Sequence, residues 1–306
     1  MPDCWPPWLM YSMADMNTKP LIPRLCVIGV GLIGGSLARA LRERGEVAEV
    51  IGSGRNEENL RAAVRLGVVD RYVTDPAQAV VGADVVVIAV PLGAIGAVLR
   101  AIVPHLAAHS VVTDVGSAKG SVVADVEQVY GHIPPGFVPG HPIAGTERSG
   151  VEASFATLFQ NRRVILTPLA ETDAAAHRLI RTMWEFTGAE VIDMGVRHHD
   201  AVLAATSHLP HMLAYTLVDT LARLDDRAEI FRYAAGGFRD FTRIASSDPR
   251  MWHDICVANR EQILEMIALF SADLQRLAAA IRNGDQNVIL TLFERAKRAR
   301  DNLYLD

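Results

Sequence analysis

The chain has 306 residues, of which 50 % are apolar and 21 % are charged, and its formal net charge at pH 7 is −5. This length and composition are typical of a globular protein with two domains. A negative net charge argues against nucleic-acid binding, which needs a basic surface, although a local arginine can still bind a small anionic substrate.

The three cysteines, Cys4, Cys26 and Cys256, are far apart and form no CxxC pair, so the sequence supports neither a disulfide framework nor a zinc site. A reducing cytoplasm is the simplest setting. Residues 1–23 lack a basic start followed by an apolar core, so we expect a disordered tail, or an upstream start codon, rather than a signal peptide. No apolar run approaches the roughly 20 residues that span a bilayer, so we expect no membrane partner.

Strand and helix patterns alternate from residue 24 to residue 195. The apolar runs predict strands over 24–28, 46–52, 83–90, 110–115, 163–167 and 190–194. Helical periodicity predicts helices over 36–44, 57–66, 95–106 and 174–187. This alternation predicts an α/β fold, a Rossmann-type doubly wound sheet, that forms a dinucleotide-binding domain over 24–195.

After residue 195 the strand patterns end, which predicts an all-α C-terminal domain over 196–306 for substrate binding and dimerisation. Within it, one set of apolar residues follows at intervals of 4, 3, 4, 3 and 4, namely Ile263, Ile267, Phe270, Leu274, Leu277 and Ile281. Such a seam is buried either inside the domain or against a second subunit. Because a small helical domain has few layers to cover it, we favour a homodimer over an ordinary core helix.

A glycine-rich turn follows the first strand directly and opens a helix, which is the context that makes a GxGxxG pattern a dinucleotide site. Gly29 allows the tight turn, Gly31 lets the backbone approach the pyrophosphate, and Gly34 lets the helix and strand pack closely. The N–H groups at the helix start, around Leu32 and Ile33, are expected to bind the phosphates.

The end of the second strand bears on the choice of nucleotide. An NAD enzyme usually places Asp or Glu about 20 residues past the glycines to bind the ribose 2′-hydroxyl. Residues 51–56 read IGSGRN and contain no carboxylate. Arg55, with Ser53 as a further donor, suits a 2′-phosphate, so we favour NADP, or use of both NADP and NAD. The alternative is that Arg55 is a solvated surface charge.

Pro91 ends the strand expected over 83–90, at the edge of the sheet where ligands bind. We expect it to line the path of the cofactor, although a structural role at the strand end explains this proline equally well.

Two later segments carry candidate catalytic residues. The segment DVGSAKG (114–120) places Ser117 at the end of a strand, and GHPIAGTERSG (140–150) holds His141 in a loop constrained by glycines and a proline. Histidine is the side chain best suited to exchange a proton near neutral pH, and a neighbouring hydroxyl can fix its tautomer. Beside a nicotinamide, this pair indicates oxidation of a hydroxylated carbon.

Together with GLIGGS (31–36) and GGFRDFTRIASSDPRMW (236–252), these segments resemble, in order, those of the prephenate/arogenate dehydrogenase family of tyrosine biosynthesis. The likeness runs from about residue 24 to the C-terminus. The glycine turn is generic, whereas the other three segments are specific together. With no fused mutase and no added regulatory domain, the chain is similar to the bacterial cyclohexadienyl dehydrogenases. The resemblance implies oxidative decarboxylation of prephenate, of arogenate, or of both.

By this resemblance, His141 hydrogen-bonds the ring hydroxyl and assists the loss of its proton, and Ser117 orients His141 or contacts the same hydroxyl. Arg243 is expected to bind a substrate carboxylate, where a planar guanidinium suits a bidentate pair. The other residues that the resemblance implies at the substrate are His208, Trp252, Glu147 and Asp240. Arg243 could instead pair with Asp240, and Trp252 could be a core aromatic residue.

Two histidine groups in the helical half could suggest a metal. His208 and His211 lie three residues apart, but Pro210 intervenes and no third ligand is evident, so we expect no metal. The segment 198–200, which reads HHD, is better interpreted as a polar helix start.

Two other functions remain as alternatives. A β-hydroxyacid dehydrogenase or imine reductase has a similar two-domain build, but a catalytic lysine on the first long helix would favour it, and residues 197–224 contain none. A non-catalytic cofactor-sensing regulator would be supported by a basic binding surface or a lost catalytic histidine, and the sequence shows neither.

Overall fold

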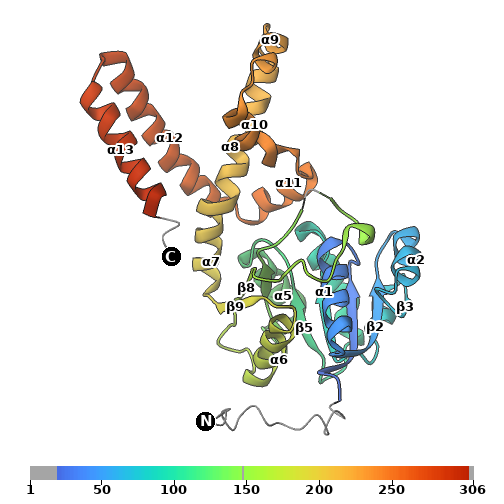
Figure 1. Ribbon diagram of the computed structural model, residues 1–306. Helices are drawn as coiled ribbons and strands as arrows, with labels where there is room; N and C mark the ends of the chain where they lie inside the picture. Colours follow the sequence, from blue (N-terminus) through green and yellow to red (C-terminus); the bar gives the residue numbers. More distant parts are fainter. Residues whose placement is uncertain (1–18, 147, 303–306) are drawn as a thin grey trace, which may run out of the picture. The chain divides into compact units, whose positions relative to one another are not determined.

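A computed structural model describes residues 19–146 and 148–302 of the chain. It divides into two compact units, residues 1–199 and 200–306, which we describe in turn (Figure 1). The predicted tail lies outside the described residues as far as residue 18. Its predicted end is wrong, because the first strand begins at Ile22, which is fully buried.

The strands of the first unit are β1 (Ile22–Ile28), β2 (Val47–Ser53), β3 (Arg71–Tyr72), β4 (Val85–Ile88), β5 (Val111–Asp114), β6 (Phe137–Val138), β7 (Gly140–Pro142), β8 (Arg163–Leu166) and β9 (Glu190–Asp193). In the described ranges, six of them form a parallel sheet in the order β3-β2-β1-β4-β5-β6. The order reverses between β1 and β4, so ligands are expected at the carboxyl ends of these two strands. The predicted Rossmann-type sheet is confirmed.

The helices of this unit are α1 (Leu32–Arg44), α2 (Glu57–Arg65), α3 (Pro76–Ala79), α4 (Ile95–Ile102), α5 (Gly120–Tyr130) and α6 (Ala174–Glu185), with short 3₁₀ turns η2 (Leu92–Ala94), η3 (Val103–His105) and η4 (Val151–Ala153). Successive residues of a strand point to opposite faces of its sheet. Accordingly Leu25 and Val27 belong to one buried cluster, and Cys26 and Ile28 to another.

A smaller sheet carries the segment that contains His141. The strand β7 pairs antiparallel with β8, and β8 pairs parallel with β9. The strands that we expected over 163–167 and 190–194 therefore exist, but they extend this second sheet rather than the parallel one. His141 lies opposite Ile165, at the centre of the β7–β8 ladder.

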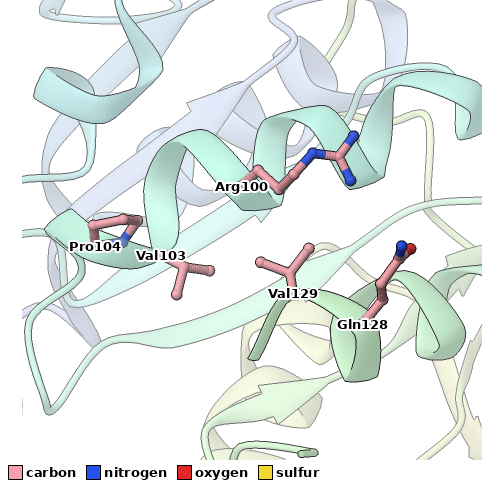
Figure 2. A pocket seen from close by; sticks show the side chains of 5 residues that line it. All are labelled: Arg100, Val103, Pro104, Gln128 and Val129. Carbon is pink, nitrogen blue, oxygen red and sulfur yellow. The ribbon is translucent and has the colours of Figure 1, made fainter. Parts of the chain in front are cut away.

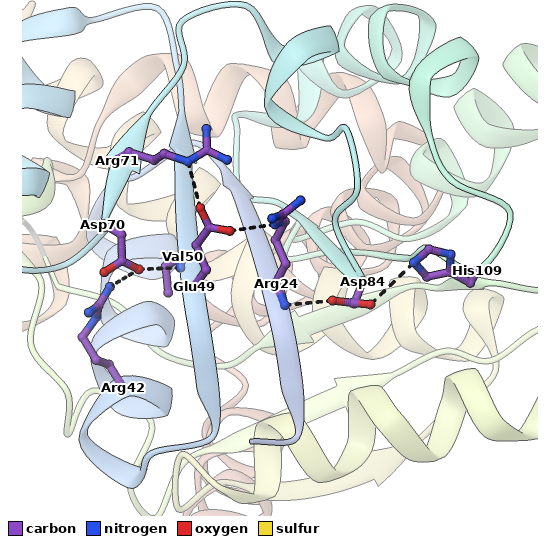
Figure 3. Close-up of polar contacts among 8 residues, drawn as sticks. All are labelled: Arg24, Arg42, Glu49, Val50, Asp70, Arg71, Asp84 and His109. Atoms are coloured by element: carbon purple, nitrogen blue, oxygen red, sulfur yellow. Dashed lines mark hydrogen bonds and ion pairs between the residues drawn. The ribbon is translucent and has the colours of Figure 1, made fainter. Parts of the chain in front are cut away.

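Charged side chains join neighbouring strands of the parallel sheet (Figure 3). Glu49 of β2 accepts hydrogen bonds from Arg24 of β1 and from Arg71 of β3, at 2.7 and 2.8 Å. The backbone N–H of Arg24 donates to the carboxylate of Asp84, which lies just before β4. The same carboxylate has its Oδ1 3.5 Å from Nε2 of His109. Because these groups are partly exposed, they contribute little to the stability of the fold.

The second unit is helical throughout its described part, as predicted. Helix α7 (Val196–Leu203) crosses the boundary between the units and continues through a π-helical turn η5 (Ala204–His208) into α8 (Leu209–Ala222). The remaining elements are α9 (Arg227–Arg232), α10 (Gly236–Thr242), the 3₁₀ turn η6 (Arg243–Ser246), α11 (Pro249–Ala258), α12 (Arg260–Asn283) and α13 (Gln286–Asn302). Helices α12 and α13 form an antiparallel hairpin (Figure 1), which turns at Gly284 with φ at +67°.

The apolar seam of α12 is fully buried only at its beginning, and of its later residues only Leu277 is partly buried. Ile263 is buried, whereas Leu274 and Ile281 are 54 % and 60 % exposed. Helix α13 adds Leu290 and Phe293, which are also more than half exposed. The seam is therefore not the core of its own unit.

Candidate active site

The glycine turn between β1 and α1 has the tight backbone that a dinucleotide site needs. Gly29 has a φ of +99°, and a Cβ atom there would lie 2.3 Å from the carbonyl oxygen of Ala89. A Cβ atom on Gly34 would lie 2.5 Å from the carbonyl oxygen of Gly29. By contrast, a Cβ atom on Gly31 would meet no atom within 4 Å. The three glycines thus provide the turn, the close packing and the open approach expected from the sequence.

The start of α1 is built to bind an anion. Gly31 is its N-cap residue, and the first hydrogen bond of the helix runs from the N–H of Gly35 to the carbonyl of Gly31 at 2.9 Å. The N–H groups of Leu32, Ile33 and Gly34 come before that bond and point out of the helix start. No acidic side chain lies in the first turn. The helix dipole and these N–H groups fit a pyrophosphate.

Asn59 of α2 joins the glycine turn to the segment that follows His141. Its Nδ2 donates to the carbonyl of Val30 at 2.7 Å, and its Oδ1 accepts from the N–H of Val151 at 3.0 Å. Ser36 of α1 accepts from the N–H of Phe155 at 3.0 Å. These contacts fix residues 151–155 against the predicted cofactor site.

The residues predicted to select the nucleotide differ in their exposure. Arg55 is exposed beyond the end of β2, where its guanidinium can reach a ligand. Ser53 is fully buried, and its hydroxyl has no hydrogen-bond partner among the described residues, so neighbouring atoms would have to move before it could contact a nucleotide. Pro91 is exposed just after β4 and begins η2, at the edge of the sheet where a dinucleotide binds.

A buried ion pair joins the loop after β5 to β7. Asp114 and Lys119 are fully buried, with 2.5 Å between Oδ2 and Nζ, and Lys119 also donates to the carbonyl of Gly140 at 2.6 Å. Asp114 accepts from the N–H of Gly116 at 2.7 Å and of Gly140 at 3.3 Å. The pair therefore ties the loop that carries Ser117, itself half-buried, to the residue before His141. No role for Lys119 follows from the sequence.

His141 is buried, and its ring has an imidazole partner. Its Nδ1 lies 2.9 Å from Nε2 of His199, and the two rings meet edge to face at 5.1 Å. His141 is 8 % exposed and His199 is fully buried. The interpretation of 198–200 as a helix start is confirmed, because α7 begins at Val196, but it did not include the burial of His199. Its spacing of four residues from Leu203 is the signal that could have placed both on the buried face of α7.

Two of the predicted substrate residues of the helical unit, His208 and Trp252, form a cluster of rings with His211. Trp252 of α11 stacks on His211 at 3.7 Å and lies 6.1 Å from the ring of His208. His208, the last residue of the π-helical turn, is buried, and its Nδ1 lies 3.1 Å from Nδ2 of Asn259. Because that amide donates, Nδ1 of His208 accepts and its hydrogen is on Nε2.

Burial is the main cause that lowers the pKa of His211, and the positive charge of Arg243 lowers it further. Arg243 is exposed in η6 near this ring, and Asp240 is exposed in α10. Glu147 lies outside the described residues. The geometry of the helical unit thus groups His208, His211 and Trp252, with Arg243 at the edge of the group.

A hollow of about 310 Å³ lies elsewhere in the first unit (Figure 2). It is lined by Arg100, Val103, Pro104, Gln128 and Val129, from the C-terminal halves of α4 and α5 and from η3. In a parallel sheet the helices run opposite to the strands, so these residues face away from the edge that carries the glycine turn. This hollow contains none of the predicted site residues.

Within residues 19–146 and 148–302, no group of three or more His, Cys, Asp or Glu side chains is placed to hold a metal ion. No helix of the described part of the chain has the length and apolar character needed to cross a membrane.

Comparison with known proteins identifies the family. The model described as "Prephenate dehydrogenase, nucleotide-binding domain" matches residues 37–193, more than half of the chain. The chain belongs to the prephenate dehydrogenase family. A second model, "Prephenate dehydrogenase, dimerization domain", matches residues 196–295. The boundary between the two family domains falls close to the predicted boundary at 195 and just before the division of the structure at residue 199.

Relatives of this prephenate dehydrogenase family member match over most of its length. A cyclohexadienyl dehydrogenase of Zymomonas mobilis is 40 % identical over 285 residues, which cover 92 % of this chain and 96 % of that protein. A prephenate dehydrogenase of Bacillus subtilis is 35 % identical over 92 % of this chain and 76 % of that protein. These matches favour the dehydrogenase interpretation over the β-hydroxyacid dehydrogenase and sensor alternatives.

Solved structures of the family have the same fold. The prephenate dehydrogenase of Aquifex aeolicus, in complex with hydroxyphenyl propionate and NAD+, superposes with a TM-score of 0.86 at 36 % identity, over 92 % of this chain and 98 % of that one. The arogenate dehydrogenase of Synechocystis has a TM-score of 0.78 at 29 % identity, over 92 % and 99 % of the two chains. The predicted resemblance and fold are confirmed.

Proposed function

We propose that the chain catalyses the NAD(P)-dependent oxidative decarboxylation of prephenate, of arogenate, or of both. The products are 4-hydroxyphenylpyruvate from prephenate and tyrosine from arogenate. One observation carries the proposal: a buried imidazole, His141, is fixed by a hydrogen-bonded ring partner within the unit that also contains a complete dinucleotide turn.

The glycine turn holds the cofactor, through Gly29, Gly31 and Gly34 and the amides of Leu32 and Ile33. When bound, the nicotinamide supplies a hydride acceptor. His141 acts on the substrate. Its neutral imidazole accepts the proton of the hydroxyl group on the substrate ring as the carbon that carries this hydroxyl becomes a carbonyl. Loss of the ring carboxylate as CO2 then makes the ring aromatic. Because aromatisation is strongly downhill, placement of the hydroxyl against His141 is the main task of the protein.

The remaining site residues bind the substrate. Arg243 pairs with a substrate carboxylate, and His208 and Trp252 line the pocket around the ring. Ser117 contacts the ring hydroxyl or orients His141. Exposure of Arg243 and burial of the neighbouring histidine–tryptophan cluster support these assignments.

For the cofactor we favour NADP, or use of both nucleotides, over strict NAD. Arg55 supports this preference because it is exposed directly after the second strand, and residues 51–56 contain no carboxylate to repel a 2′-phosphate. The burial of Ser53 leaves Arg55 as the main determinant.

We propose a homodimer that forms through α12 and α13. Leu274, Ile281, Leu290 and Phe293 present a row of exposed apolar side chains that a monomer would leave in water. The match of this region to a dimerization domain supports the same assembly. Free, buried Cys26 fits the reducing cytoplasm that we propose as the location.

Reduced-nicotinamide absorbance on a two-by-two grid, prephenate or arogenate with NAD+ or NADP+, tests the function. We expect turnover with at least one combination of substrate and nucleotide, and a rate with NADP+ at least as high as that with NAD+. Absence of turnover in all four cells, from folded protein that binds a dinucleotide, would overturn the proposal.

A further inference from the structure

We propose that His199 is a positioning residue for His141, which keeps His141 in the tautomer that can accept a proton and shares that proton during turnover. The inference rests on the proposed function, because it assigns His141 the role of proton acceptor. It deepens that function by adding a second imidazole that sequence patterns did not reveal.

The imidazole rings of His141 and His199 contact each other directly, in a buried place. His141 Nδ1 and His199 Nε2 are 2.9 Å apart, which is hydrogen-bond distance. His199 is fully buried, so water does not compete for this bond. The two rings come from different elements, β7 and α7, so their approach is a property of the folded unit rather than of a local turn. His141 thereby has its Nδ1 turned toward the protein.

The hydrogen bond has two possible directions, and only one is compatible with catalysis. If His141 donates its Nδ1–H to His199, its Nε2 is unprotonated and can accept the hydroxyl proton. If His199 donates instead, Nε2 of His141 carries the hydrogen and cannot act as a base. A partner that accepts at this position therefore selects the active tautomer, as an ordinary hydrophobic neighbour could not.

The same bond stabilises the protonated state that follows. When Nε2 of His141 takes the hydroxyl proton, the Nδ1–H bond to His199 becomes charge-assisted and therefore stronger. The proton on Nδ1 can move to Nε2 of His199, so that the positive charge is shared by the two rings. In the overall reaction the hydroxyl hydrogen is not lost, because the aromatic product is a phenol. The phenolate oxygen takes a proton back from Nε2 of His141, and the proton on His199 returns to Nδ1.

Other titratable groups on neighbouring elements do not replace His199. Three titratable groups lie on β5, on β8 or in the loop after β5, which pack against β7 or the residue before His141: Asp114, Lys119 and Arg163. Three more lie on α7: Arg197, His198 and Asp200. Asp114 and Lys119 neutralise each other, and Arg163 is exposed and paired with Glu190. All of these groups stay in place when His199 is substituted, so a changed pH profile reports on the imidazole pair.

Two substitutions of His199 separate positioning from packing. The His199→Leu variant keeps an apolar volume but removes the acceptor, whereas His199→Gln keeps an acceptor oxygen near the position of Nε2 but cannot take up a proton. The matched control is His198→Gln, one residue away and exposed on the same helix. Each variant is assayed for kcat, KM, dinucleotide affinity and the pH dependence of kcat/KM.

We expect His199→Leu to lower kcat on the order of 10²-fold, with KM and dinucleotide affinity nearly unchanged, because proton transfer contributes about 10²- to 10⁴-fold in enzymes. The acidic limb of its pH profile should move to lower pH, since the protonated His141 loses its acceptor. His199→Gln should recover on the order of tenfold of the loss. A loss that is equal in both variants, or an unmoved acidic limb, would overturn the proposal and leave a packing role.

A measurement without substrate keeps this inference separate from the proposed function. Long-range ¹H–¹⁵N NMR of protein labelled at histidine, with His141→Asn to assign the signals, reports the tautomer of His141 directly. The inference expects a hydrogen on Nδ1 in the unsubstituted chain and in His199→Gln, and a mixture of tautomers in His199→Leu. A hydrogen on Nε2 in the unsubstituted chain would refute it, whatever the activity grid shows.

Discussion

The two units of the chain differ in how completely they cover their apolar side chains. In the first unit, both faces of the parallel sheet are buried. Each face has its own apolar cluster, and successive side chains of β1 alternate between the two clusters. In the second unit, Leu274, Ile281 and Phe293 are each more than half exposed. The first unit covers the apolar side chains of its sheet by itself, whereas α12 and α13 leave apolar side chains exposed, where we propose that a second copy binds.

The two units also differ in whether the ion pairs compared below are buried or exposed. The first unit buries an ion pair, Asp114 with Lys119, between two backbone segments that it fixes in place. In the second unit, the ion pair of Lys297 with Asp301 lies on an exposed helix surface. Buried charges are costly to separate and exposed ones are not, so matched substitutions in the two units should have unequal effects.

The largest effect is expected from breaking the buried pair. Lys119→Met leaves the carboxylate of Asp114 buried without its cation, which should destabilise the first unit by about 3–5 kcal/mol. Chemical denaturation followed by tryptophan fluorescence measures the change. Lys297→Met, the matched substitution in the second unit, should leave stability unchanged. Equal effects of the two substitutions would remove this contrast between the units.

The next effect concerns the exposed face of the helical unit. Leu274→Glu places a charge on the apolar row of α12, and the proposed symmetric dimer contains this substitution twice. Losing about 1.5 kcal/mol per leucine should weaken the dimer more than 100-fold. Analytical ultracentrifugation should show monomers for Leu274→Glu but dimers for Leu66→Glu, an exposed leucine of the first unit. A dimer that survives Leu274→Glu would place the interface elsewhere.

A smaller effect is expected at the nucleotide. Arg55→Ala removes the exposed guanidinium after β2 and should weaken NADP+ binding about tenfold, with little change for NAD+. Titration of intrinsic fluorescence with each nucleotide measures both affinities. If both affinities fall by the same factor, Arg55 does not contact a 2′-phosphate.

The smallest effect is a pH dependence in the helical unit. Burial and the charge of Arg243 lower the pKa of His211 in the folded state. The unfolded imidazole binds a proton near its ordinary pKa of about 6.5, so folded stability is complete above that pH and is lost as the pH falls below it. The melting temperature of the unsubstituted chain should therefore fall, relative to that of His211→Phe, between pH 7 and pH 5. A constant difference would mean that folding does not lower the pKa of His211.

The sequence predicted the features that depend on local pattern. The glycine turn, the strand–helix alternation and the change to helices after residue 195 follow from neighbouring residues, and the structure confirms each. Strand β7 has three residues, too few for a period, and helix α5 begins at Gly120, a poor helix former, so neither was predicted.

The missed parts of the site depend on long-range packing. Lys119 and His199 are both polar residues in polar-looking segments, and each is buried by elements distant in the sequence. Asp114 and Gly140 enclose Lys119, and His141, 58 residues earlier in the chain, contacts His199. The contacts of Lys119 and His199 cannot be derived from local pattern, because they exist only in the folded chain. The spacing of His199 from Leu203 indicates a buried helix face, but it does not identify His141 as the partner.

The most direct test of the account is the turnover of His141→Asn, measured with the dinucleotide affinity of the same variant. We expect kcat to fall by about 10²- to 10⁴-fold and the affinity for NAD+ or NADP+ to stay within about twofold, because the glycine turn is separate from the imidazole. Turnover near that of the unsubstituted chain would contradict the assignment of His141 as the proton acceptor.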